Sequence, residues 1–121
     1  MGFTRYFNGN VTLTPSLIED VLSIVEEAKV TLNGWDGTGS PTISVDELYF
    51  NGSDAAGEAY EIFLIKNGDQ FGFCKTNEQP YDLVIATILR RIEATNPGFK
   101  HSSDGGYQED KVSKLYSTLF S

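Results

Sequence analysis

The chain has 121 residues, of which 40% are hydrophobic, and a formal net charge of −8. These values are typical of one folded domain over residues 1–121, and they exclude a disordered chain. The negative charge argues against direct binding to nucleic-acid phosphates or to an anionic membrane surface. Its simplest interpretation is solubility. A sharper interpretation is a surface that meets a basic partner, for example by imitating nucleic acid.

The content of cysteine and of long apolar runs bears on the compartment. Cys74 is the one cysteine, so no internal disulfide can form. The first residues carry no apolar run of signal-peptide length, and no later stretch reaches the roughly 18 apolar residues of a membrane span. We therefore expect a protein of the cytoplasm that does not enter a membrane.

The first part of the chain predicts a strand followed by a helix. Residues 3–13 alternate loosely in polarity around the turn signal at residues 8–10, which predicts a short strand or a small hairpin. Thr14 is placed to cap a helix, and Pro15 suits the first helical position. Apolar residues then recur at spacings of three and four, so the helix is expected over about 15–30.

Three strand-like runs follow a glycine-rich loop at residues 33–41. They cover residues 42–50, 58–66 and 70–75. Asn67-Gly68-Asp69 joins the last two runs, and Asn-Gly is a strong hairpin signal. The three runs therefore predict an antiparallel meander.

Two further helices complete the predicted fold. Pro80 opens a helix whose apolar residues cover most of its circumference, so it is expected to be surrounded by protein. Residues 99–103 predict a short extended piece or a loop, and residues 107–120 predict a last helix. The fold class is therefore α+β, with a three-stranded antiparallel meander and a short N-terminal strand packed against about three helices.

Catalytic chemistry has weak support in the sequence. Cys74 and His101 are the single thiol and the single imidazole, and an aspartate such as Asp82 or Asp104 would have to orient the histidine. The stronger interpretation of Cys74 is a small buried residue of a strand. One cysteine and one histidine do not predict a zinc site. No catalytic residue, metal or cofactor is therefore predicted.

Two loops carry the candidate binding residues. Trp35 and Asp36 lie in the glycine-rich loop, and tryptophan is enriched at binding hot spots. The alternative, which we favour slightly, is that Trp35 folds back as a plug over the sheet. Asp104 and Tyr107 lie in the turn before the last helix and form the second candidate site.

Three polar residues are expected to have structural roles. Thr14 and Asp82 are predicted helix caps, and Asp82 is expected to accept hydrogen bonds from backbone amides at the start of its helix or in the nearby loop. Asp104 is expected to do the same at the last helix, in addition to its candidate binding role. These structural roles are favoured over catalysis.

Two segments resemble a known group of proteins. The first is Tyr6-Phe7-Asn8-Gly9-Asn10-Val11-Thr12-Leu13-Thr14-Pro15. The second, which is more specific, combines Phe71-Gly72-Phe73-Cys74-Lys75-Thr76 with Pro80-Tyr81-Asp82 and Ser102-Ser103-Asp104-Gly105. Together they resemble small acidic proteins encoded in bacteriophage and prophage genomes, whose role is uncharacterised. The resemblance implies a phage or prophage gene and a bacterial host cytoplasm, and it supplies no catalytic residues.

The leading functional hypothesis is therefore a non-enzymatic interaction protein. Such a protein would bind a host protein, including a nucleic-acid-binding defence factor, and inhibit or redirect it. One alternative is a structural phage component that assembles with copies of itself. Another is a small thiol-dependent enzyme that uses Cys74 and His101.

Overall fold

The structure is a computed structural model and describes residues 2–120. Its elements follow one another as β1 (Thr4–Val11), α1 (Pro15–Ala28), β2 (Thr42–Ile43), β3 (Glu47–Phe50), β4 (Phe63–Lys66), β5 (Gly68–Lys75), α2 (Asp82–Thr95), β6 (Lys100–Ser103) and α3 (Glu109–Phe120). The predicted α+β class is confirmed, because the described residues form three helices and antiparallel strands.

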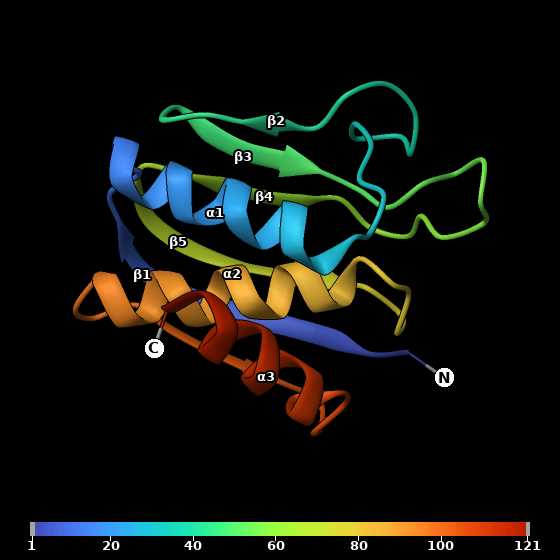
Figure 1. The fold of residues 1–121 in the computed structure, drawn as a ribbon. Coiled ribbons are helices and arrows are strands. Elements are labelled where there is room, and N and C mark those ends of the chain that lie inside the picture. Colours follow the sequence, from blue (N-terminus) through green and yellow to red (C-terminus); the bar gives the residue numbers. More distant parts are fainter. Residues whose placement is uncertain (1, 121) are drawn as a thin grey trace.

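The strands form two antiparallel sheets (Figure 1). One sheet has the order β5-β1-β6, and the other has the order β2-β3-β4. The N-terminal strand β1 is therefore a central strand: all eight of its residues are in register with β5, from Thr4 opposite Lys75 to Val11 opposite Gly68. On its other side, residues 5–8 of β1 are in register with β6.

The turn predicted inside the N-terminal segment is absent, and β1 runs straight through Asn8, Gly9 and Asn10. Gly9 has a backbone φ of 118°, which residues that carry a side chain rarely adopt. A Cβ atom there would overlap the carbonyl oxygen of Gly98 and lie 2.6 Å from Cα of Phe99. The glycine therefore serves a close approach between two backbones and does not mark a turn.

The meander is present, but its strands differ from the prediction. It consists of β2, β3 and β4, whereas the run at 70–75 pairs with β1. The connection at Asn67 is held by neighbouring segments: its side-chain oxygen accepts from the amide of Leu13 at 2.7 Å, and its Nδ2 donates to the carbonyl of Val45 at 2.8 Å. β4 and β5 therefore separate after the connection and do not form a hairpin ladder.

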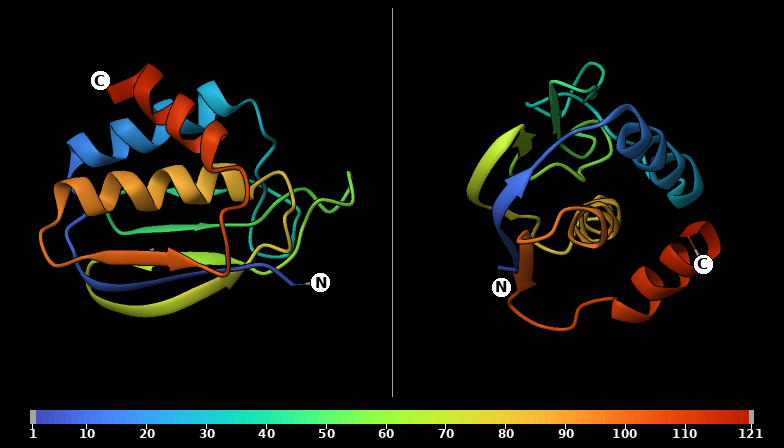
Figure 2. Two further views of the ribbon diagram at one scale, coloured as in Figure 1. Left: turned by 90° about the horizontal axis from the view of Figure 1, so that it is seen from below. Right: turned by 90° about the vertical axis from the view of Figure 1, so that its left-hand side faces the viewer.

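The helices lie on one side of the strands, with α2 innermost (Figure 2). In the end-on view the strands curve around α2, and α1 and α3 lie beyond it. Eight residues of α2 are buried, which confirms that this helix is surrounded by protein. α1 begins with Thr14, whose hydroxyl accepts from the amide of Leu17 at 3.1 Å, and it ends before Lys29, which has the left-handed φ of 55°.

The hydrophobic core joins both sheets to all three helices. Its members are distributed over β1, β3, β4, β5 and every helix. Within it, Phe7 packs edge-on against Phe63, with ring centroids 5.7 Å apart, and stacks with Phe99 at 6.4 Å. Within residues 2–120, no helix combines the length and the apolar character needed to cross a membrane.

Candidate functional site

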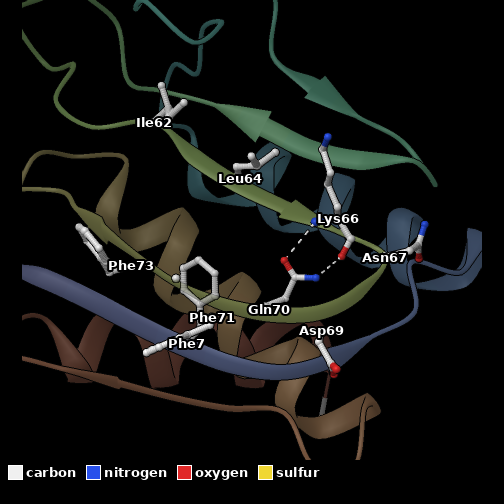
Figure 3. Close-up of a pocket in the computed structure, with 10 residues that line it drawn as sticks. Phe7, Ile62, Leu64, Lys66, Asn67, Asp69, Gln70, Phe71 and Phe73 are labelled. Atoms are coloured by element: carbon white, nitrogen blue, oxygen red, sulfur yellow. Dashed lines mark hydrogen bonds between the residues drawn. The ribbon is translucent and has the colours of Figure 1, made fainter.

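A groove of about 510 Å³ lies between β4 and β5 (Figure 3). Both strands are edge strands, each at the end of its own sheet, and they face each other across this groove. The groove is lined by Phe7, Ile62, Leu64, Lys66, Asn67, Asp69, Gln70, Phe71, Gly72 and Phe73. Its volume lies in the range of ligand-binding pockets.

Polar contacts close the groove at its two ends. At one end the Gln70 side chain bridges to β4: its Oε1 accepts from the amide of Lys66 at 3.4 Å, and its Nε2 donates to the carbonyls of Lys66 and Gly68. At the other end the Glu61 amide donates to the Lys75 carbonyl at 3.3 Å, and Glu61 Oε1 accepts from the Lys75 amide at 2.8 Å.

Between these contacts the two strands have backbone groups without a strand partner. Backbone direction alternates along a strand, and the Lys75 backbone points away from β1 towards Glu61. The backbone groups of Phe71 and Phe73 therefore also point into the groove. Since Lys66 faces Gln70, the same alternation directs the backbone groups of Leu64 into the groove from β4.

Three aromatic side chains cover the outer surface beside the groove, and we call them the outer aromatic face: Tyr6, Phe71 and Phe73. Their exposed fractions are 42%, 94% and 64%. Tyr6 and Phe73 are opposite each other in β1 and β5, so the face is continuous across two strands. A phenylalanine that is 94% exposed is unusual, because large apolar side chains are normally removed from water.

The outer aromatic face was not among the candidate sites predicted from the sequence. Phe71 and Phe73 flank Gly72 in β5, and their apolar character suggests the core-facing side of a strand. Gly72 faces the core instead, where a Cβ atom would lie 3.0 Å from the ring of Phe7. Glycine and the buried Cys74 at alternate positions are the signal that could have placed the phenylalanines outside.

Asp82 accepts from side chains of three other segments and does not cap α2 as predicted. The Arg5 guanidinium donates to both carboxylate oxygens of Asp82, at 2.9 and 2.8 Å, and both residues are buried. Thr76 Oγ1 and Gln108 Nε2 donate to the same carboxylate, at 2.6 and 2.9 Å. The first residue before α2 is Tyr81, which makes no side-chain cap bond. This buried network ties β1, the loop after β5 and the start of α3 to α2.

Asp104 stabilises β1 and not the last helix, which corrects its predicted capping role. Its carboxylate accepts from the Thr4 amide at 3.0 Å and from the Tyr6 hydroxyl at 2.8 Å. The hydrogen bond to Asp104 raises the pKa of Tyr6. Tyr107 lies nearby over Phe3, with ring centroids 5.5 Å apart, and its hydroxyl donates to the Glu78 carbonyl. Both candidate residues therefore take part in packing around β1.

Trp35 is 60% exposed, so the prediction that it plugs the sheet is wrong. Its loop is held by Asn51, whose Nδ2 donates to the carbonyl oxygens of Trp35 and Tyr60. Asp36 accepts from the amide and hydroxyl of Thr38, and these bonds lower its pKa. Trp35 and Asp36 thus form an exposed loop surface that is separate from the packing around Asp104 and Tyr107.

Cys74 and His101 lie on different strands with β1 between them. Cys74 is opposite Arg5 in β5, whereas His101 is opposite Phe7 in β6. Two strand spacings separate them by roughly 10 Å. His101 Nδ1 is 2.9 Å from Glu93 Oε1. The geometry does not support a thiol–imidazole pair.

We expect Cys74 to resist thiol reagents in the native protein. It is fully buried, and desolvation raises its pKa to about 12. Because the unfolded thiol ionises near its ordinary pKa of roughly 8.5, the native state holds its proton more tightly, and Cys74 should contribute a loss of stability as the pH rises from that value towards 12. Maleimide labelling at pH 8 should proceed only in denaturant, and rapid labelling of the folded protein would contradict the burial.

Metal ligands do not cluster in the part of the chain that the structure describes: no group of three or more His, Cys, Asp or Glu residues could hold an ion there. Comparisons with models of known families, with curated proteins and with solved structures find no significant match.

Proposed function

We propose that this protein acts by binding another protein through the outer aromatic face and the adjoining groove. The observation that carries the proposal is the exposure of Phe71 and Phe73, at 94% and 64%, on neighbouring outward positions of an edge strand. Exposed apolar patches of this kind mark interaction surfaces, and aromatic residues are enriched in them.

The charge and the resemblance indicate what the partner is. A protein with a net charge of −8 attracts positively charged proteins over distances of about a Debye length. The resemblance to small acidic phage and prophage proteins supports a partner that belongs to a bacterial host. We therefore propose that the chain binds a basic host protein, such as a nucleic-acid-binding defence factor, and inhibits or redirects it in the bacterial cytoplasm.

A pair of surface variants tests this proposal against the loop candidate of the sequence analysis. In affinity capture from a bacterial lysate, the double variant Phe71→Ser, Phe73→Ser should bind the partner at least about 30-fold more weakly. This is the loss of affinity expected for hot-spot residues that contribute about 2 kcal/mol or more. Trp35→Ser, which changes another exposed aromatic, should retain it.

The reciprocal result would move the binding surface to the loop at 33–41. Retention of the partner by both variants would exclude the outer aromatic face. Both variants should keep the thermal transition of the wild type, because each changed side chain is mostly exposed.

Self-assembly is the second candidate function, and the free edges of β4 and β5 favour it. Edge strands with unpaired backbone groups can pair with another copy of the same chain. This candidate requires two copies that each carry a charge of −8 to approach, so association should increase with salt. Light scattering that shows monomer at low and high ionic strength would exclude it.

A further inference from the structure

We infer that the groove between β4 and β5 binds an extended segment of a positively charged partner, which adds as a strand to the free edge of β5. This inference rests on the proposed function and specifies how the partner is held. Its first support is the backbone of Phe71 and Phe73, whose N–H and C=O groups point into the groove and have no strand partner. An extended segment that aligns with β5 would satisfy these groups.

The closed ends of the groove set the length of the bound segment. From Ile62 to Lys66 a strand rises by about 13 Å, which accommodates roughly four residues of an extended chain. The Gln70 side chain occupies one end and the Glu61–Lys75 contacts occupy the other. A short extended segment fits this space, whereas a helix of about 10 Å diameter exceeds the space of a single strand.

The side chains around the groove define what the segment carries. Its outward side chains would lie beside Phe71 and Phe73, so apolar residues at alternate positions are favoured there. Its outward side chains would also meet Leu64, which is on the exposed face of β4, and its inward side chains would meet the floor formed by Phe7. Among the lining residues Asp69 is acidic and Lys66 is basic, so the preference for Lys or Arg in the flanking residues comes from Glu61 at the far end and from the net charge of −8.

The net charge of this chain favours a different protein, and not a second copy of the chain, as the occupant of the groove. Two copies would each bring a net charge of −8, and their repulsion opposes pairing at physiological salt. A basic segment is attracted by the same charge. The expected occupant is therefore a strand with alternating apolar residues and flanking positive charges.

The test begins with a displayed library of random linear peptides selected on the intact protein. Enriched peptides should combine alternating apolar residues with a positive net charge, and replacing each of their Lys and Arg residues by Glu should abolish binding in fluorescence anisotropy. On binding, the amides of Phe71 and Phe73 should become protected from hydrogen exchange. Selection that yields no binder, or protection confined to other strands, would overturn the inference.

Two substitutions at one position then separate backbone pairing from apolar contact. Phe71 lies opposite Asn8 in β1 but directs its amide into the groove, so Phe71→Pro removes a groove donor without removing a bond to β1. It should weaken binding roughly fivefold more than Phe71→Ser, the value of one lost hydrogen bond of about 1 kcal/mol. Circular dichroism must first show that both variants fold, and the exchange measurement on the wild type decides the question if Phe71→Pro does not.

The outcomes also distinguish this inference from the proposed function. If Phe71→Ser weakens binding but Phe71→Pro adds nothing and the edge amides stay unprotected, the outer aromatic face binds and strand addition is wrong. If neither substitution changes binding, the proposed function fails as well. If the edge amides are instead protected in a concentration-dependent dimer of this chain, the occupant of the groove is a second copy and not a basic partner, and the inference is wrong.

Discussion

Replacing Asp82 by alanine should destabilise the protein by about 3–5 kcal/mol, because the buried Arg5 cation loses its close carboxylate and keeps the half-exposed Glu109 at 3.8 Å. Arg5 is 2% exposed and donates two hydrogen bonds to the Asp82 carboxylate. Thr76 and Gln108 lose their acceptor in the same substitution. Urea unfolding followed by circular dichroism measures the loss as a lower midpoint at an unchanged slope.

A second ion pair supplies the matched control. Arg91 and Asp20 are 2.9 Å apart but each is about a quarter exposed, so Asp20→Ala should cost less than about 1 kcal/mol. Adding Arg5→Met to Asp82→Ala should recover part of the stability, because the uncompensated charge is removed. Equal losses for Asp82→Ala and Asp20→Ala would show that the buried network contributes little.

Gly9→Ala is the second substitution with a large expected effect, a loss of about 3 kcal/mol. The φ of 118° is strained for alanine, and the new methyl group would also overlap the backbone of Gly98 and Phe99. Because Phe99 is fully buried, the neighbouring chain cannot move away without disturbing the core. Thermal unfolding should show a lower midpoint, with a native far-UV spectrum at low temperature.

Gly68→Ala separates backbone strain from steric overlap. Gly68 has a similar φ of 102°, but no atom lies within 4 Å of a Cβ built there. Its substitution should therefore cost only the conformational strain, about 1–2 kcal/mol. If Gly9→Ala lowers the stability no more than Gly68→Ala does, the backbone of Gly98 must lie farther from β1 than in the structure.

The helices could be predicted because their signals lie within short windows of sequence. Thr14 and Pro15 mark the start of α1, and the apolar stripe that follows repeats at the helical period. The same holds for α2, where apolar residues on nearly every side indicate a buried helix. Each signal depends on residues within a few positions of one another, so no knowledge of the rest of the fold is needed.

The candidate site could not be predicted, because strand pairing depends on residues far apart in the chain. Asn67-Gly68 is a hairpin signal, yet β5 pairs along its whole length with β1. A long central strand offers β5 more hydrogen bonds than the four residues of β4. This choice leaves two facing edges and opens the groove, and it is visible only when all strands are placed.

The sequence by itself determined the charge of the protein, its α+β class and the positions of its helices. Only the tertiary structure decided that Phe71 and Phe73 face outward, that Trp35 is exposed, and that Arg5 meets Asp82 across 77 positions of the chain. Local periodicity shows that a strand has two faces, but it does not show which face meets the core when both carry apolar residues. In β5 the ring of Phe7 determines which face is buried, because it occupies the space beside Gly72. The core-facing position therefore accepts glycine, and Phe71 and Phe73 lie on the outer face.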